Sequence, residues 1–271
     1  ETGHQKTIFE AMNYSVKAGG KRLRPLLMRE VYRLFGGNGP EIEPFMAAME
    51  MIHTSSLIHD DLPCMDNDEL RRGLPTTWKK FGYDMAVLAG DALMIYAFET
   101  ASRAFAMTRY PDRAARAIQV LAEKTGIYGM IGGQVVDVQL TGKPVPQEKL
   151  DFIYRLKTGA LLEASMMIGA ILGGASADEV KCVEEIASAV GLAFQIQDDI
   201  LDVTSTSEAL GKPVLSDEKN QKTTYVTLVG LEQAKKNVEA ISARAVSLLK
   251  ELPGNNAFLE NLIAMLVERK K

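Results

Sequence analysis

Two clusters of aspartates are the residues of this sequence that are best suited to chemistry. The first runs from Asp60 to Asp66 as Asp-Asp-Leu-Pro-Cys-Met-Asp, and the second runs from Asp198 to Asp202 as Asp-Asp-Ile-Leu-Asp. Apolar residues flank both clusters, and a carboxylate is costly there unless it is paired or bound to a metal. Carboxylate oxygens suit hard divalent cations, and Mg²⁺ is usually held by a few carboxylates together with waters and substrate phosphates. The clusters therefore predict a metal site for a diphosphate.

The two clusters place different demands on the backbone. Asp198 and Asp202 are four residues apart and share one face of a predicted helix, with Asp199 beside them. Like charges at that spacing repel, so the arrangement is unfavourable without cations. Pro63 interrupts any helix in the first cluster, so the chain must form a loop there. A solvated helix end is the alternative interpretation of either cluster alone, but the presence of two favours a metal site.

Basic residues complement the acids. The segment from Gly19 to Pro25 (Gly-Gly-Lys-Arg-Leu-Arg-Pro) places three cations beside two glycines, a composition suited to phosphate oxygens. A short basic stretch is by itself usually solvated surface. Further basic residues follow the first acidic cluster or lie near later helix ends: Arg71, Arg72, Lys157, Lys212 and Lys222. Together with the aspartates, they predict a site that holds one diphosphate through metal and another by direct contact.

Composition narrows the class of protein. Of the 271 residues, 46% are hydrophobic, which is enough for a large buried core. The formal net charge of −4 argues against general affinity for nucleic acids. The only two cysteines, Cys64 and Cys182, are far apart, which indicates a reducing compartment without disulfides. We find no apolar run of membrane-spanning length and no signal peptide at positions 1–10, so we expect a cytoplasmic protein without a membrane span.

Helix-period patterning covers nearly the whole chain, and alternating β-branched runs are absent. The segments with the strongest pattern are 43–59, 84–107, 113–140, 147–172, 177–203 and 231–252. They are rich in good helix formers. Segments with glycine and proline at 36–40, 142–144, 173–174, 211–213 and 253–254 predict helix ends. The pattern predicts an all-α fold, and the absence of a linker or repeat predicts a single domain over residues 1–271.

The motifs also occur in an order that resembles a known family. They lie at residues 19–25, 60–66, 71–73, 132–134 (Gly-Gly-Gln), 157–158 (Lys-Thr) and 194–202. This ordered set is similar to that of the trans-isoprenyl diphosphate synthases, in the short-chain branch that makes farnesyl or geranylgeranyl diphosphate. The similarity extends from about Ala11 to Tyr225. Each motif is modest alone, but the ordered set is highly specific.

The resemblance implies the isoprenoid synthase fold, a single large bundle of long helices around a deep central cavity. It also implies a homodimer that uses three Mg²⁺ ions. The implied reaction joins isopentenyl diphosphate to an allylic diphosphate, with metal and cationic side chains neutralising the leaving diphosphate. The released diphosphate would act as the base, and the closed site would exclude water from the allylic cation.

Residue roles follow from the resemblance alone. The implied metal ligands are Asp60, Asp61, Asp66, Asp198, Asp199 and Asp202. The implied contacts of the allylic diphosphate are Arg71, Lys157, Lys212 and Lys222, and those of isopentenyl diphosphate are Lys21, Arg24, His53 and Arg72. Thr158 and Gln195 would lie near the developing cation, with a helix-packing hydrogen bond as the alternative for each. A buried core histidine is the alternative for His53. Leu215 departs from the glycine of many relatives, which puts the shape of that loop in doubt.

One local feature of the sequence bears on the length of the product. Ser55, Ile52 and Ala48 recur at three and four residues on the helix that leads into Asp60, so they form a stripe that could line the chain pocket. In the family, an aromatic ring often stands five residues before the first aspartate when growth stops at fifteen carbons. Ser55 is small, so we expect a twenty-carbon geranylgeranyl product, with a fifteen-carbon farnesyl product as the alternative if Ile52 closes the pocket.

Two other functions remain open. A terpene cyclase shares a helical cavity with aspartate-rich metal sites, but it does not need Lys21, Arg24 and Arg72 for a second diphosphate. A non-catalytic subunit of a synthase commonly loses one aspartate cluster, whereas both are intact here.

Overall fold

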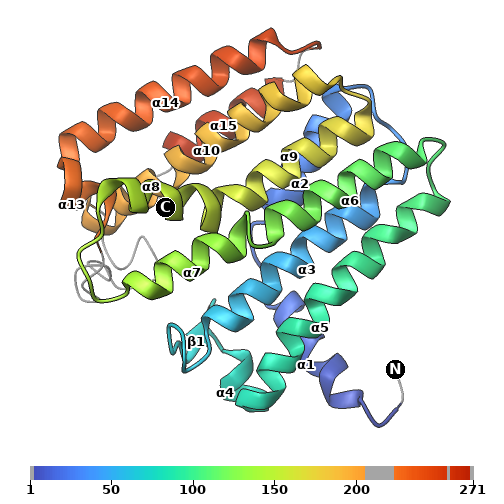
Figure 1. The fold of residues 1–271 in the computed structure, drawn as a ribbon, viewed down its shortest axis with the longest axis vertical. Coiled ribbons are helices and arrows are strands. Elements are labelled where there is room, and N and C mark those ends of the chain that lie inside the picture. The colour runs from blue at the N-terminus through green and yellow to red at the C-terminus, as the bar shows by residue number, and fades with distance from the viewer. Residues whose placement is uncertain (1–2, 205–222, 255–256, 269–271) are drawn as a thin grey trace.

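The structure, a computed structural model, describes residues 3–204, 223–254 and 257–268. Residues 266–268 are described by their backbone alone. Helices make up most of this part of the chain (Figure 1). In chain order they are α1 (Lys6–Lys17), α2 (Leu23–Leu34), α3 (Ile42–Asp60), α4 (Thr77–Phe81), α5 (Tyr83–Ser102), η1 (Arg103–Ala106), α6 (Pro111–Thr125), α7 (Met130–Leu140), α8 (Gln147–Ile153), η2 (Tyr154–Gly159), α9 (Ala160–Gly173), α10 (Ala177–Thr204), α13 (Tyr225–Val229), α14 (Leu231–Glu251) and α15 (Ala257–Glu268). The predicted all-α class is confirmed.

Helix α9 lies at the centre of the bundle. Every residue from Ala160 to Leu172 is buried, as expected for a helix that protein encloses on all sides. It contacts α2, α3, α6 and α10. Gly169 permits the close approach of α2, because a Cβ atom there would lie 2.3 Å from the carbonyl oxygen of Met28. The main apolar core extends from α9 to residues of α2, α3, α5, α6, α10, α14 and α15.

Two predicted helices are interrupted. The predicted helix 113–140 is divided into α6 and α7, because α6 ends at Thr125 and the chain turns between Gly126 and Gly129, where glycine disfavours helix. The predicted helix 147–172 contains the π-helical segment η2 between α8 and α9. Such wide turns are rare and often occur at functional sites. Both interruptions lie beside the cavity described below.

The chain turns sharply where α3 ends. The amide nitrogen of Asp66 donates to the carbonyl oxygen of Asp60 at 2.9 Å, which closes a loop over the first aspartate cluster, as its proline predicts. Strands β1 (Leu70–Arg71) and β2 (Leu74–Pro75) then form a short antiparallel hairpin that was not predicted from the sequence. The hairpin returns the chain toward the end of α3.

Two helical stretches of the described chain have the length and composition to cross a membrane, contrary to the expectation from the sequence. They are Tyr83–Ala106 and Gln147–Gly173. In the second stretch 78% of the most apolar window is buried inside the protein, because it contains the core helix α9. In the first stretch 39% is buried, and α5 presents several exposed apolar side chains.

Candidate active site

A cavity of about 750 Å³ lies between α3, α5, α7, α9 and α10. Its apolar wall includes Met94, Met130, Ile131, Val135, Leu161 and Phe194. Its polar wall includes Arg24, His53, Asp60, Gln134, Lys157, Thr158, Gln195 and Asp198. One residue from each aspartate cluster therefore lines the same cavity, although the two are far apart in sequence. Seven of the predicted site residues line this cavity: Arg24, His53, Asp60, Lys157, Thr158, Gln195 and Asp198.

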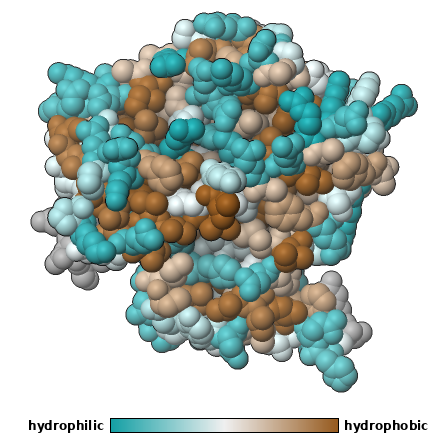
Figure 2. Space-filling model, in the orientation of Figure 1, coloured by the Kyte–Doolittle hydropathy of each residue, from teal (hydrophilic) through white to brown (hydrophobic). Residues whose placement is uncertain are grey.

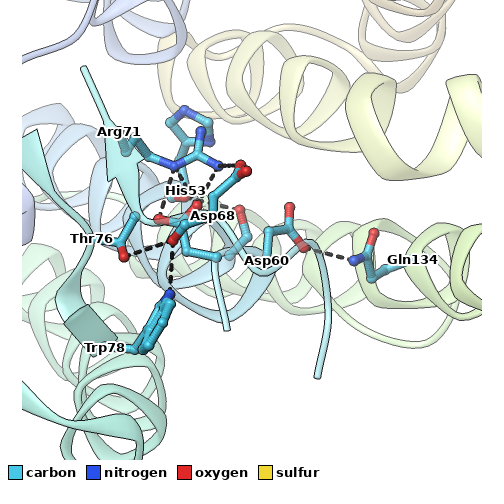
Figure 3. A network of polar contacts seen from close by, with 9 residues as sticks. His53, Asp60, Asp68, Arg71, Thr76, Trp78 and Gln134 are labelled. Atoms are coloured by element: carbon cyan, nitrogen blue, oxygen red, sulfur yellow. Dashed lines mark hydrogen bonds and ion pairs between the residues drawn. The ribbon is translucent and has the colours of Figure 1, made fainter. Parts of the chain in front are cut away.

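Asp60, at the end of α3, is the residue of the first cluster that lines the cavity. Its Oδ1 atom accepts a hydrogen bond of 2.6 Å from Nε2 of Gln134 on α7 (Figure 3). Burial raises the pKa of Asp60, the ammonium of Lys157 opposes that shift, and the carboxylate of Asp66 reinforces it. A buried carboxylate that is this costly to ionise would gain from a cation beside it.

Asp61 points away from the cavity. It is 3% exposed, and its two carboxylate oxygens accept hydrogen bonds from Nε of Arg71 at 2.7 and 2.9 Å. Nη2 of Arg71 lies 2.5 Å from the same carboxylate. Neither residue lines the cavity, so the predicted roles of Asp61 as a metal ligand and Arg71 as a diphosphate contact stay predictions. The hairpin presents the guanidinium to the carboxylate, so each residue is occupied by the other.

Asp66 is exposed in the loop that follows α3. It does not line the cavity, but its charge acts on Asp60 and on Lys157, whose pKa it helps to raise. Asp66 therefore lies near the predicted metal site without contributing to its wall in this conformation.

The second cluster divides in the same way. Asp198 lines the cavity, whereas Asp199 and Asp202 are each 3% exposed within the protein. Oδ2 of Asp199 accepts hydrogen bonds from the hydroxyl of Tyr154 at 2.6 Å and from the backbone nitrogen of Tyr225 at 2.8 Å. Asp199 thus fastens α10 to η2 and α13. Asp199 does not line the cavity that Asp198 lines, because adjacent helix residues point in directions about 100° apart. Its predicted role as a ligand stays a prediction.

The cavity fits a hydrated divalent ion better than a bare one. Among the residues that the structure describes, no three histidine, cysteine or acidic side chains converge into a group that could hold a metal alone. Asp60 and Asp198 nevertheless line one cavity, and hard carboxylate oxygens are the donors that Mg²⁺ prefers. Mg²⁺ commonly takes one or two carboxylates and completes its shell with water and substrate phosphates. The residues present therefore fit the implied ion.

Segment η2 presents Lys157 and Thr158 to the cavity. Nζ of Lys157 donates to Oδ2 of Asp137 on α7 at 2.6 Å. Burial would lower the pKa of Lys157, but the carboxylates of Asp60 and Asp137 outweigh it and raise the pKa above its usual value. Oγ1 of Thr158 donates to Oε1 of Gln195 at 3.0 Å, so the helix-packing hydrogen bond foreseen for this pair is present beside the cavity.

Arg24 places a buried guanidinium in the cavity wall. Burial lowers the pKa of Arg24 to about 10, with the charge of Glu50 opposing the shift, and Nε of Arg24 has no hydrogen-bond partner among the described residues. Next to it, His53 has a pKa well below its usual value, first because of burial and then because of nearby arginines, led by Arg24. A neutral histidine and an unsatisfied guanidinium make an anion site in need of an anion.

Lys21 and Arg72 lie outside this wall. Lys21 is exposed, and Nη1 of Arg72 donates to the backbone oxygen of Gly19. Arg72 still acts electrostatically on His53, so it lies in the same cationic region. Arg22, which no prediction singled out, also acts on His53 but is paired with Glu50.

The predicted chain-length residues do not reach the cavity. Ser55 and Ile52 are both 0% exposed and are absent from its wall, and the hydroxyl of Ser55 donates to the carbonyl oxygen of Ile52 at 2.8 Å. The neighbouring serine, Ser56, does line the cavity. Four residues before Asp60, Ser56 lies on the same face of α3, whereas Ser55 is turned away by roughly 140°.

Lys212, Lys222 and the departure at Leu215 lie outside the described residues.

The comparison with protein families shows the family to which the chain belongs. The model of the polyprenyl synthetase family matches residues 5–253. The chain belongs to the polyprenyl synthetase family. The resemblance inferred from the ordered motifs is thereby confirmed, and so is the isoprenoid synthase fold.

Named relatives of this polyprenyl synthetase include enzymes of two product classes. The chain is 50% identical over 242 residues to the heterodimeric geranylgeranyl pyrophosphate synthase large subunit 1 of Arabidopsis thaliana, covering 88% of this chain and 65% of the relative. It is 47% identical over 229 residues to the farnesyl diphosphate synthase of Geobacillus stearothermophilus, covering 84% and 77%. A crystal structure of geranyltransferase from Helicobacter pylori, complexed with magnesium and isoprenyl diphosphate, superposes with a TM-score of 0.84 at 34% identity, covering 98% of this chain and 89% of that one.

The comparisons correct the predicted location. The plant relatives of this polyprenyl synthetase are named chloroplastic, so the cytoplasmic prediction is wrong. It rested on few cysteines and on the lack of an apolar leader. Low cysteine content separates reducing from oxidising compartments but not one reducing compartment from another, and plastid transit peptides are amphipathic rather than apolar.

Several residues of the site were not assigned a role from the sequence. Gln134 and Asp137 on α7 contact Asp60 and Lys157, and Ser56 and Met94 line the cavity. Gln134 belongs to the Gly-Gly-Gln motif that contributed to the resemblance, so the motif was a signal for it. The residue before Gln134 in this motif, Gly133, must lack a side chain, because a Cβ atom there would lie 2.3 Å from the backbone nitrogen of Lys157.

Proposed function

We propose that this chain is a prenyltransferase that condenses isopentenyl diphosphate with an allylic diphosphate in the presence of Mg²⁺. The observation that carries the proposal is a single cavity whose wall includes Asp60, Asp198 and the unsatisfied guanidinium of Arg24. An anion site and an acidic metal site in one apolar cavity suit a reaction between two diphosphates. The names of the relatives support the same activity.

Asp60 and Asp198 would hold the metal, with Asp66 close enough to join when the loop after α3 closes. Bound Mg²⁺ would neutralise charge on the departing diphosphate of the allylic substrate. Lys157 adds a cation on the same side of the cavity, and its raised pKa keeps it protonated at neutral pH. The predicted count of three ions remains part of the proposal.

Arg24 and the arginines around His53 would hold the second diphosphate. A phosphate oxygen placed near Arg24 would satisfy its buried Nε atom, which has no partner among the described residues. His53 is uncharged there, so it can hydrogen-bond to phosphate without adding a buried charge. The C–O bond of isopentenyl diphosphate does not break in this reaction. Direct contacts without metal therefore suit this substrate, which must keep its diphosphate.

The apolar wall protects the allylic cation between the two steps. Met130, Leu161 and Phe194 exclude water, which would otherwise capture the cation as an alcohol. Thr158 and Gln195 lie on the polar side, where their oxygen dipoles would favour positive charge on the substrate. The released diphosphate would then remove the proton, so the site needs no separate base.

We propose a twenty-carbon product, geranylgeranyl diphosphate. Geranylgeranyl pyrophosphate synthases are prominent among the relatives, and a farnesyl diphosphate synthase makes the fifteen-carbon product the alternative. The small side chain of Ser55 does not support this choice, since Ser55 lies outside the cavity. The small side chain of Ser56 in the cavity wall leaves room for a long product.

We propose that the chain is one domain and forms a homodimer through α5 and the turn before α7. Large apolar side chains gather on the face seen in Figure 2, and those of α5 and the turn before α7 that do not line the cavity are 37–74% exposed: Leu88, Ile95, Tyr96, Ile127 and Tyr128. Soluble proteins rarely leave so much apolar surface to water. One relative is named a heterodimeric subunit, so pairing with a different chain is the alternative.

The test is chain-length analysis of the products. The purified chain, incubated with Mg²⁺, isopentenyl diphosphate and labelled farnesyl diphosphate, should yield a twenty-carbon product, and chelation of the metal should abolish it. Consumption of the allylic substrate alone would point to a cyclase. No turnover of either substrate would contradict the enzymatic proposal, and mass determination in solution would test the homodimer.

A further inference from the structure

Gln134, on helix α7, lines the cavity on the side of Asp60. Its Nε2 atom lies 2.6 Å from Oδ1 of Asp60, and the two side chains point toward each other from different helices (Figure 3). A carboxylate cannot donate a hydrogen bond when ionised, so the amide nitrogen of Gln134 must face it. The amide oxygen is therefore turned away from Asp60.

This amide oxygen is the unusual atom. Oε1 of Gln134 is buried and has no hydrogen-bond partner among the described residues. Lys157, the lysine in the cavity wall, already donates to Asp137. A buried acceptor without a donor is unfavourable, and such atoms call for an explanation such as an unseen water or ion.

The contrast between Asp60 and Asp61 shows what a neutral partner achieves. Asp61 is held by Arg71, whose positive charge cancels that of the carboxylate. Asp60 is held by Gln134, which fixes one oxygen atom but carries no charge. The neutral amide of Gln134 thus leaves the charge of Asp60 uncancelled, while burial raises the pKa of the carboxyl and the ammonium of Lys157 opposes that shift. Only a ligand with positive charge would use that negative charge.

Helix α7 is held firmly enough for this task. Gly133 brings its backbone against that of Lys157, and Asp137, three residues after Gln134, pairs with the same lysine. The position of Gln134 is therefore tied to both sides of the site.

We propose that Gln134 is a positioning residue of the metal centre: Nε2 fixes the ligand Asp60, and Oε1 accepts a hydrogen bond from a water of the Mg²⁺ hydration shell. Mg²⁺ gives up its waters reluctantly and usually keeps several when it binds to proteins. Those waters are strong donors that would arrive with the ion. The inference rests on the proposed Mg²⁺-dependent function.

The test measures metal binding directly. Titration calorimetry with Mg²⁺ in the presence of inorganic diphosphate compares the wild-type protein with Gln134→Met, which keeps the length of the side chain but removes both polar atoms. We expect Mg²⁺ to bind about 10- to 100-fold more weakly, the usual effect of losing an outer-shell partner. Gln119→Met, at an exposed glutamine on α6, is the matched control and should bind as wild type does.

A structural role alone would lower thermal stability without metal and leave Mg²⁺ affinity unchanged. The melting temperature without Mg²⁺ is therefore measured for each variant. If Gln134→Met does not fold, Gln134→Asn serves instead, since its shorter amide cannot reach both partners. Mg²⁺ affinity equal to wild type in a folded variant would overturn the proposal. Failure of the wild-type protein to bind Mg²⁺ would instead contradict the proposed function.

Discussion

Nζ of Lys157 lies 2.6 Å from Oδ2 of Asp137, so the lysine that faces the cavity already has a carboxylate partner. The lysine comes from the π-helical segment η2, and the aspartate comes from α7. A diphosphate that binds beside Lys157 must share its ammonium with Asp137. The pair thus sets the charge that the site offers to its substrate.

Asp137→Asn should strengthen the binding of inorganic diphosphate in the absence of metal. The substitution retains an oxygen acceptor for Lys157 but removes a negative charge near the ligand. We expect about a fivefold lower dissociation constant, which corresponds to about 1 kcal/mol of repulsion between charges at short range. Calorimetric titration with inorganic diphosphate checks this. Weaker binding would mean that the ion pair is needed to hold Lys157 in place.

Asp60→Ala and Asp198→Ala should each reduce the turnover number on the order of 10³-fold, because each removes a carboxylate that would hold the metal and with it several kcal/mol of charge stabilisation. The circular dichroism of the helices should remain unchanged. Asp178→Ala, in the first turn of α10 and away from the cavity, is the control. Full activity in either cavity variant would contradict the proposed metal site.

Arg24→Met should separate binding from stability. Loss of the buried guanidinium should raise KM for isopentenyl diphosphate by about tenfold or more, because a charge-assisted contact with phosphate is lost. Without substrate, the free energy of unfolding should rise by roughly 1 kcal/mol, since a buried charge with an unsatisfied Nε atom is replaced by an apolar chain. Steady-state kinetics and denaturant unfolding measure the two effects. A less stable variant with unchanged KM would refute this view of Arg24.

Ser56→Phe should shorten the product. The ring would enter the cavity one helical turn before Asp60, where the growing chain would meet it. Ser55→Phe is the informative comparison, because Ser55 is fully buried outside the cavity and a ring there should lower the free energy of unfolding by about 1–3 kcal/mol through overpacking. Chromatography of the dephosphorylated products reports the lengths. An unchanged product from Ser56→Phe would show that the chain grows elsewhere.

His53 should make the protein less stable as the pH falls below about 6.5, the unperturbed pKa of histidine. Burial, followed by the charge of Arg24, lowers the pKa of His53 in the folded protein. Below that unperturbed value the unfolded chain therefore binds a proton that the folded chain does not. The free energy of unfolding should fall by up to about 1.4 kcal/mol per pH unit for this group. His53→Gln should remove that contribution, whereas His4→Gln, at an exposed histidine, should not.

The sequence alone predicted many residues of the candidate site and most of the helices. Aspartates in two clusters, basic residues beside glycines and long runs of helix formers are local patterns, and local patterns predict chemistry and secondary structure. Pro63 predicted the loop after α3 because proline restricts its own backbone. The break between α6 and α7 was missed although its glycines were visible, since glycine weakens a helix without forbidding it.

Only the tertiary structure decided which member of each cluster lines the cavity. Asp60 lines the cavity and Asp61 does not, because the hairpin from Leu70 to Pro75 brings Arg71 to one of two adjacent carboxylates. Sequence spacing gives the angle between residues on a helix but not the direction in which a neighbouring helix lies. For the same reason Ser56, rather than Ser55, faces the cavity, and Gln134 meets Asp60 across a gap of 74 residues. Such pairings depend on how α3, α7 and α10 pack around α9, which is a property of the whole core.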